Sequence, residues 1–239
     1  MIYPNYLVLI FVRNPTFSIN VLSQKNIIFG IMFVDIHTHC FPPKSKYAIC
    51  NLNVEEAQEF LQLDKQSFFS SGFHPWYLNQ YSEKRISELE QMLSDKRILA
   101  IGECGLDKNT SFTINEQQFV FEKQIALSEK FRKPLIIHCV GCFNELIAIK
   151  KKLNPRQLWI IHGFRGKAQL AEQLLRSGCS LSFGEKFNEE SVLITPFERF
   201  FVETDESKLP IEVIYQRLAE AKKCSVSDLS AGERWLNTL

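Results

Sequence analysis

From residue 33 onward the chain alternates short apolar runs with longer amphipathic segments. A short apolar run is typical of a buried β-strand, whereas apolar residues at helical spacing over ten or more positions predict a helix. We predict strands at residues 33–37, 47–51, 67–72, 98–103, 134–138, 158–162, 179–183 and 200–203. We predict helices at residues 54–63, 83–93, 116–131, 143–153, 167–176 and 211–223.

Strands that alternate with helices indicate βα units and a parallel sheet. Eight strands favour an α/β fold of the TIM type, a (β/α)8 barrel, and a compact one because such barrels typically have about 250 residues. Segments 40–46 and 188–195 leave room for a short helix at most, so we expect trimmed helices after strands one and seven. A doubly wound open sheet is the alternative. It requires a glycine-rich turn after its first strand, where this chain has Cys40-Phe41-Pro42-Pro43.

Residues 1–31 differ in composition from the rest of the chain. They contain no Asp or Glu, and their only charged residues are Arg13 and Lys25. The apolar run at 7–12 is too short to cross a bilayer, and the features of a signal peptide are missing, so we expect no membrane association. Met32 precedes the first strand directly and is the expected natural start. Residues 1–31 are then a non-native or disordered extension, and residues 32–239 a single domain.

The formal net charge of +1 provides no global basic field for nucleic acid, which would have to be bound by a local patch or by metals.

The cysteines number seven, and several lie inside apolar runs. An odd number in such places indicates the reduced thiols of a cytoplasmic protein. Cys139 and Cys142 form a CxxC without a second pair to complete a zinc ribbon. We interpret both as structural, with a redox pair as the alternative.

Titratable side chains gather where the predicted strands end. The five histidines all lie at, or within two residues of, the C-terminal end of a predicted strand, and two carboxylates do the same. These side chains are His37, His39, His74, Glu103, His138, His162 and Asp205. Because the active sites of barrels form at the C-terminal ends of the strands, we expect these side chains to converge.

Imidazoles and carboxylates are the ligands of divalent cations such as Zn, Mn, Fe or Mg. His37 and His39 are two residues apart and share a strand face, although alone they fit a pair of core or surface histidines equally well. The six candidate ligands are too many for one tetrahedral zinc with an open position. We therefore expect two cations, about 3.5–4 Å apart, that share a carboxylate and activate water. The candidates are His37, His39, Glu103, His138, His162 and Asp205.

Six ordered stretches resemble the TatD family of metal-dependent hydrolases, within the amidohydrolase-like barrels. They are FVDIHTH at 33–39, GFHP at 72–75, IGECGLD at 101–107, PLIIH at 134–138, HGF at 162–164 and VETD at 202–205. The resemblance runs from residue 33 to about residue 207. It implies a TatD-type deoxyribonuclease with 3′–5′ exonuclease action, and some members of the family are linked to deacylation of mischarged transfer RNA.

The resemblance also implies a role for each matching residue. One metal would be held by His37, His39, Glu103 and Asp205. Glu103 would bridge to a second metal, which His138 and His162 hold. Asp205 would accept the proton of the attacking water, which makes Asp205 and Glu103 the catalytic carboxylates. His74, in Gly-x-His-Pro, would contact the substrate, most directly at a phosphate.

The chain departs from the family pattern near the expected substrate. Val140 stands where many members carry arginine, Gly163 and Arg165 replace a Cys and a Ser, and Lys108 replaces an aromatic residue. Arg165 and Lys108 are candidates for replacing a lost phosphate contact, and the alternative is that both are solvated. Trp76 either stacks on a base or forms a hydrophobic lid.

Two further carboxylates are expected beneath the site. Asp35 lies two residues before His37 and Glu203 two residues before Asp205, so each is expected on the same strand face and one step deeper. There Asp35 would have a structural role or would orient a ligand, and Glu203 would support the site.

The main functional hypothesis is a two-metal phosphodiesterase acting on DNA or another phosphodiester, without an obligate protein partner. The alternative is a metal-dependent amidase, esterase, lactonase or aminoacyl-tRNA deacylase-like hydrolase, because one barrel hosts many reactions. A third hypothesis, a non-catalytic binding protein, is disfavoured by the complete set of ligands.

Overall fold

The computed structural model describes residues 31–238. Except for Ile31, the expectation for residues 1–31 concerns residues outside that range. The strands are β1 (Asp35–Thr38), β2 (Ala48–Leu52), β3 (Phe68–Ser71), β4 (Ile98–Asp107), β5 (Leu135–Val140), β6 (Trp159–Ile161), β7 (Ser180–Phe183) and β8 (Phe200–Val202). The α-helices are α2 (Val54–Leu63), α3 (Glu83–Met92), α4 (Ile114–Phe131), α5 (Phe143–Leu153), α6 (Ala168–Arg176), α7 (Glu189–Ile194), α8 (Ile211–Lys222) and α9 (Ala231–Leu236). Short 3-10 turns are η1 (Pro75–Gln80), η2 (Phe197–Arg199) and η3 (Val226–Asp228).

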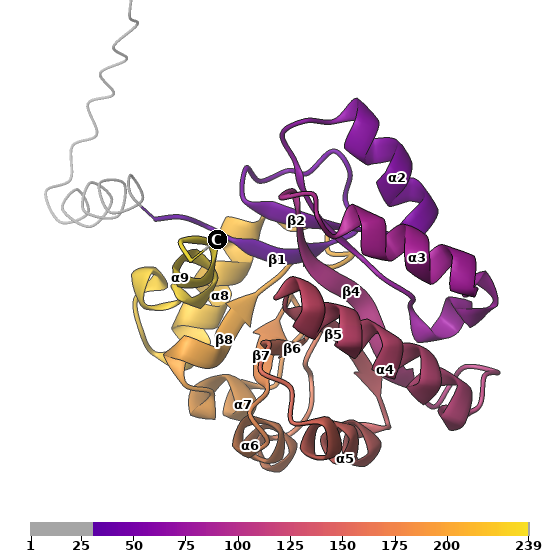
Figure 1. Cartoon of the computed structure of the whole chain (residues 1–239). Helices are drawn as coiled ribbons and strands as arrows, with labels where there is room; N and C mark the ends of the chain where they lie inside the picture. Colours follow the sequence, from indigo (N-terminus) through magenta and orange to yellow (C-terminus); the bar gives the residue numbers. More distant parts are fainter. Residues whose placement is uncertain (1–30, 239) are drawn as a thin grey trace, which may run out of the picture. The chain divides into compact units, whose positions relative to one another are not determined.

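The eight strands form one parallel sheet in the order β1 to β8, with the helices outside it (Figure 1). The sheet closes where β1 meets the residues after β8. The backbone N–H of Asp205 donates to the carbonyl of His37 at 2.9 Å, and the N–H of His39 donates to the carbonyl of Asp205 at 3.2 Å. The (β/α)8 barrel predicted from the sequence is therefore confirmed, and the open sheet is excluded.

The connections after β1 and β7 are trimmed, as predicted. Segment 39–47 contains no helix, and α7 after β7 has 6 residues. The sequence pattern did not predict the continuation of β4 to Asp107, the three 3-10 turns or helix α9, and η1 begins at the proline of the Gly-x-His-Pro stretch. Within the described residues, none of the helices has the length and apolarity needed to cross a lipid bilayer.

The core has two parts, one between sheet and helices and a smaller one inside the barrel. The interior part consists of Ile36, Ile49, Leu99, Ala100, Ile136, Ile160, Phe201 and Ala231. Trp235 of α9 packs against this interior part. Gly232, also in α9, lies very close to Val34, because a Cβ added at residue 232 would be 2.9 Å from the Cβ of Val34. Apolar side chains thus occupy the barrel below the strand ends, and polar side chains are left at the C-terminal end.

Candidate metal centre

Glu103, near the end of β4, lies at the middle of the predicted ligands. Its Oε2 atom is 3.0 Å from Nε2 of His39 and 3.6 Å from Nε2 of His37. The Oδ1 atom of Asp205 lies 3.6 Å from Nε2 of His39 and 3.8 Å from Nε2 of His37. His37, His39 and Asp205 bring their ligand atoms within 4.8 Å of one another and could hold a metal ion.

The other oxygen of Glu103 faces a second group of histidines. Its Oε1 atom is 2.7 Å from Nε2 of His162, 3.6 Å from Nδ1 of His138 and 3.7 Å from Nε2 of His74. The structure therefore brings all six candidate ligands together, with His74 beside them. One buried carboxylate presents a different oxygen to each group of histidines, which is the arrangement that a bridging ligand requires.

The backbone of β1 explains how both of its histidines reach the site. The pairing of β1 with β2 shifts register between Asp35 and Thr38, so side chains do not alternate regularly there. Of the two roles expected for Asp35, the contacts support the structural one rather than the orientation of a ligand. The carboxylate of Asp35 instead accepts hydrogen bonds from the backbone N–H of Thr204 at 2.9 Å and from its hydroxyl at 2.6 Å.

Asp205 has a left-handed backbone with φ of 53°, which is uncommon for a residue other than glycine. Its two backbone hydrogen bonds to β1 hold this conformation. Strained residues of this kind persist only where their surroundings over-determine them, and they cluster at active sites. The strain places the carboxylate of Asp205 beside His37 and His39 at the mouth of the barrel.

Burial and charge give the site unusual titration. Burial lowers the pKa of His37 to about 3, so its ring is neutral at physiological pH. Burial alone would raise the pKa of Glu103, but His162, whose own pKa Glu103 raises despite its burial, lowers the pKa of Glu103 well below its usual value. The carboxylate is therefore ionised among imidazoles. For Asp205, burial and the nearby Glu203 raise the pKa, which makes it the more basic carboxylate of the two.

The donor atoms fit a divalent cation. Among the described residues, neither ring nitrogen of the fully buried His37 has a hydrogen-bond partner. A buried polar group without a partner is costly, and a metal ion coordinated by the ring would remove that cost. Neutral imidazoles and ionised carboxylates are the forms in which these side chains coordinate metals.

Two further carboxylates face the outer nitrogens of His138 and His162. Nε2 of His138 lies 2.9 Å from Oδ2 of Asp107, at the end of β4. Nδ1 of His162 lies 3.5 Å from Oε1 of Glu203, which also accepts the backbone N–H of Gly163 at 2.6 Å. In each ring the nitrogen opposite the carboxylate faces Glu103. The hydrogen bond to Asp107 fixes the tautomer of His138, whereas Nδ1 of His162 lies within ion-pair distance of Glu203 and makes no hydrogen bond among the described residues.

His74 is held differently from the other histidines. Its Nδ1 atom accepts the backbone N–H of Trp76 at 3.1 Å and so carries no proton. Burial lowers the pKa of His74 to about 4, so the ring is neutral and its hydrogen lies on Nε2. That nitrogen is a hydrogen-bond donor at the edge of the site. In this tautomer Nε2 has no free lone pair for a metal, although His74, Glu103 and His138 also bring ligand atoms within 4.8 Å of one another.

A cavity of ≈ 640 Å³ opens above the ligands, and Trp76, Tyr77 and Arg165 are among the side chains that line it. Trp76 is 51% exposed and Tyr77 53% exposed, although the indole N–H of Trp76 donates to Oδ2 of Asp107 at 2.6 Å. An aromatic side chain that is anchored and half-exposed presents a face to the cavity. Arg165 is exposed at its rim.

The positions that depart from the family pattern divide between two places. Val140, Gly163 and Arg165 line an adjoining cavity of ≈ 350 Å³ that also reaches His162. Lys108 does not line the cavity above the ligands. Its aliphatic stem packs over Gly141, where a Cβ would lie 2.3 Å from Cδ of the lysine.

Asp107 and Asn51 belong to the site but have no predicted role. Asn51 donates to Oε2 of Glu103 at 3.4 Å and accepts the hydroxyl of Ser70 at 3.1 Å. Its position at the end of the predicted strand 47–51 is a signal that could have identified it. Asp107 is the last residue of the IGECGLD stretch. It lies beyond residue 103, where the predicted strand ends, so the sequence did not assign this carboxylate to the site.

Cys139 and Cys142 are buried free thiols. Burial raises the pKa of both groups, so the reactive thiolate is disfavoured and the structural interpretation is preferred over a redox pair.

Comparison with known proteins gives one consistent result. The family model for TatD-related DNases matches residues 31–226. A 3′-5′ ssDNA/RNA exonuclease TatD from Erwinia tasmaniensis is 30% identical over 172 residues, which cover 66% of this chain and 66% of that protein. The 3′-5′ RNA nuclease TATDN2 of Homo sapiens is 35% identical over 146 residues, which cover 56% of this chain and 19% of that protein. In both comparisons the chain spans less than two thirds of the relative.

A solved structure with the same fold is YJJV, a TatD homologue from Escherichia coli. It superposes with a TM-score of 0.70 over 86% of this chain and 96% of that one, at 19% sequence identity.

Proposed function

Because this chain belongs to the TatD-related DNase family, we propose that it is a metal-dependent hydrolase of phosphodiester bonds in single-stranded nucleic acid, with 3′–5′ exonuclease action. The observation that carries the proposal is the position of Glu103, whose two oxygens face two separate groups of histidines. We propose further that residues 32–239 form the hydrolase domain and that the free, largely buried thiols belong to a cytoplasmic protein.

His37, His39 and Asp205 would hold one divalent cation. His138 and His162, which both face Oε1 of Glu103, would hold a second, with Glu103 shared between the two cations. Such cations, when bound, neutralise phosphoryl oxygens and lower the pKa of water. A ligand set of mostly imidazoles favours Zn, Mn or Fe over Mg, which prefers carboxylate and water oxygens. Asp107 and Glu203 keep the β5 and β6 imidazoles pointed at Glu103.

Asp205 is the proton acceptor in this proposal. Its pKa is raised by burial and by Glu203, and its partial exposure of 23% at the mouth of the site gives water access to it. As the water oxygen forms a bond to phosphorus, Asp205 takes a proton from that water. The bond from phosphorus to the leaving nucleoside oxygen breaks, that oxygen takes up a proton from solvent, and Asp205 releases its own proton to solvent to complete the cycle.

The cavity residues would position the strand. Nε2–H of His74 donates to a phosphate oxygen, and the Arg165 guanidinium can pair with the same group or a neighbouring one. Trp76 and Tyr77 provide exposed aromatic faces on which unpaired bases stack. Stacking does not read sequence, so we expect little base preference.

The test is hydrolysis of an end-labelled single-stranded oligonucleotide by the Mn-loaded chain and by Asp205→Asn. Glu206→Gln is the matched control, because Glu206 follows Asp205 and lines the same cavity. We expect Asp205→Asn to lose activity by about a thousandfold, within the range of general-base catalysis, and Glu206→Gln to keep it. No hydrolysis by the loaded wild type, together with hydrolysis of a carboxylic ester or amide, would refute the proposal in favour of the alternative hydrolase.

A further inference from the structure

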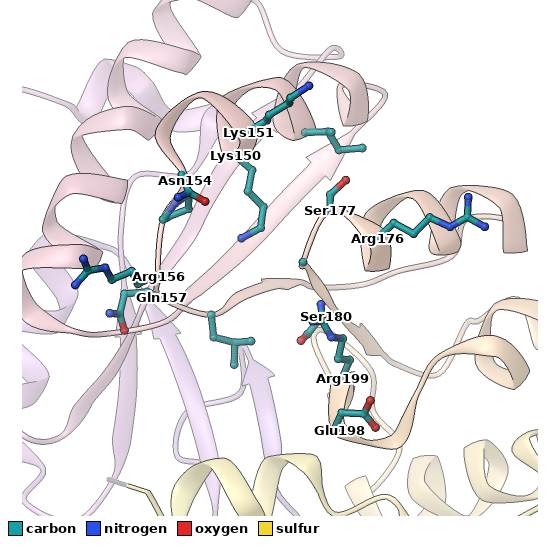
Figure 2. A pocket seen from close by; sticks show the side chains of 14 residues that line it. Lys150, Lys151, Asn154, Arg156, Gln157, Arg176, Ser177, Ser180, Glu198 and Arg199 are labelled. Atoms are coloured by element: carbon teal, nitrogen blue, oxygen red, sulfur yellow. The ribbon is translucent and has the colours of Figure 1, made fainter.

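A second cavity, of ≈ 680 Å³, lies at the opposite end of the barrel from the histidines. Its wall includes Leu158, Ser180 and Arg199, which stand at the starts of β6, β7 and β8. The proposed active site uses the other ends of the same strands. Figure 2 shows Lys150 of α5 extending into the middle of this cavity, with Arg199 across from it. We call it the basal cavity.

The basal cavity is strongly positive. Five cationic side chains line it and one carboxylate, that of Glu198, does so. The cations are Lys150, Lys151, Arg156, Arg176 and Arg199. Another acid near Lys150 is Glu129, whose Oε1 atom is already engaged by the backbone N–H groups of Arg156 and Gln157 at 3.0 and 2.9 Å.

Lys150 is the informative residue of this group. It is only 9% exposed, and its ammonium lies 4.4 Å from the centroid of the Trp159 ring. Within residues 31–238 its Nζ atom has no hydrogen bond and no carboxylate within 4.0 Å. Burial lowers its pKa, and the charge of Arg199 adds to that effect. Lysine is rarely buried to this extent without a carboxylate partner, and its Nζ atom, which is not among the fully buried nitrogens, keeps its contact with solvent through the basal cavity.

The ends of α5 and α6 explain part of the positive charge. Lys151 and Arg176 lie in the last turns of these helices, where cations interact favourably with the free carbonyls. Arg199 donates to the carbonyls of Leu175 and Cys179 at 3.3 and 3.1 Å. Lys150 also lies in the last turn of α5, but its ammonium is turned toward the basal cavity and makes no hydrogen bond to any residue that the structure describes.

We propose that the basal cavity binds a small phosphorylated molecule of about the size of a nucleoside monophosphate, with its phosphate on Lys150 and Arg199. Several converging cations match the multiple charge and the many acceptor oxygens of a phosphate. The cavity volume falls within the range of about 300–1,000 Å³ that is typical of small-molecule sites, and it exceeds what a phosphate alone would fill. Ile147, Pro155 and Leu158 supply an apolar wall for the organic part of the ligand.

The proposal does not depend on the nuclease activity, because it rests on residues at the other end of the barrel. The experiment is isothermal titration of the full chain with AMP, inorganic phosphate and adenosine. Lys150→Met keeps the stem that covers Trp159 and removes the charge. Lys152→Met is the matched control, since Lys152 is on the same helix, exposed and 3.2 Å from Glu122. Glu198→Gln removes the negative charge from the rim and, being exposed, does not endanger the fold.

We expect the wild type to bind one AMP per chain. Lys150→Met should lower the affinity for AMP by about tenfold or abolish binding, which is the effect of losing one charged hydrogen bond. Glu198→Gln should bind AMP more tightly, Lys152→Met should match the wild type, adenosine should not bind, and phosphate should bind more weakly than AMP. AMP binding that ignores both Lys150→Met and Glu198→Gln would overturn the proposal. Equal affinities for phosphate and AMP would also overturn it. A further titration with a single-stranded oligonucleotide would overturn it if Lys150→Met weakened the binding of the oligonucleotide and left the binding of AMP unchanged.

Discussion

The Oδ2 atom of Asp107 lies 2.9 Å from Nε2 of His138, and this contact determines which nitrogen of the histidine faces the metal centre. The N–H on Nε2 donates to the carboxylate, so Nδ1 keeps its lone pair and points to Oε1 of Glu103 at 3.6 Å. The same Asp107 oxygen accepts the indole N–H of Trp76 at 2.6 Å. One buried carboxylate therefore connects a proposed ligand with a proposed base-stacking residue.

We predict that Asp107→Asn lowers the metal affinity by about 10- to 100-fold, the usual effect of losing the carboxylate behind a ligating histidine. The amide replaces the charge that selects the tautomer of His138. Asn109→Ala is the control, because residue 109 contacts Asp107 only through its backbone N–H. Titration of the chelator-treated protein with Mn²⁺ measures the effect. Equal affinities for Asp107→Asn and Asn109→Ala would contradict this role.

For His74, we predict that His74→Asn keeps the full metal content while turnover falls by about 10- to 100-fold, as expected on losing one charge-assisted hydrogen bond to substrate. Asparagine can still cap the N–H of Trp76, but it cannot place a donor as far into the site as Nε2 of the ring. Metal analysis and oligonucleotide turnover on the same preparation separate the two effects. Loss of one metal equivalent in His74→Asn would instead make His74 a ligand.

Two substitutions of Trp76 separate the contribution of its aromatic face from that of its indole hydrogen bond. We predict that Trp76→Ala raises the KM for single-stranded substrate by about tenfold, since stacking on an aromatic side chain contributes about 1–3 kcal/mol per base. Trp76→Phe keeps a face and loses the bond to Asp107, so it should fall between Ala and wild type. If both variants retain the wild-type KM, Trp76 is a lid residue.

Asp35 provides a prediction of pH dependence. Burial raises the pKa of Asp35 from 3.8 to about 7, so the folded chain holds a proton that the unfolded chain releases near pH 4. The stability that this group contributes is fully present below the unfolded pKa and is lost as the pH rises through about 7. Asp35→Asn can still bond to Thr204 and cannot ionise. Urea denaturation in chelator at about pH 5 and about pH 8 should show a smaller loss of stability in Asp35→Asn. A loss equal to that of the wild type would refute the assignment.

The sequence predicted the fold because the strongest strands are fully buried and their pattern is unambiguous. Strands such as β5 and β6 are continuous apolar runs between helix signals, and the trimmed connections follow from the short spacing between runs. The extension of β4 to Asp107 could not be read in this way, since Gly-Glu-Cys-Gly-Leu-Asp has no regular alternation, and its burial comes from neighbouring strands. Helix α9 is short, and its packing against the interior core of the barrel is a tertiary effect.

The ligands could be located because histidines at strand ends are rare and conspicuous, while the residues behind them were harder to assign. The assignment of Asp35 assumed strict alternation, which the register shift in β1 removes. Asp107 lies beyond the predicted end of its strand. Lys150 was part of a run of three lysines that would ordinarily be solvated, and only the fold shows it to be buried beside Trp159.

The most direct test of the account is the metal content of the Mn-saturated chain, measured by mass spectrometry of the metal after removal of free ion, for the wild type and for Glu103→Gln. Because Glu103 presents one oxygen to each group of histidines, the account predicts close to two equivalents in the wild type and fewer than one in Glu103→Gln. Two equivalents retained in Glu103→Gln, or none bound by a folded wild type, would contradict it.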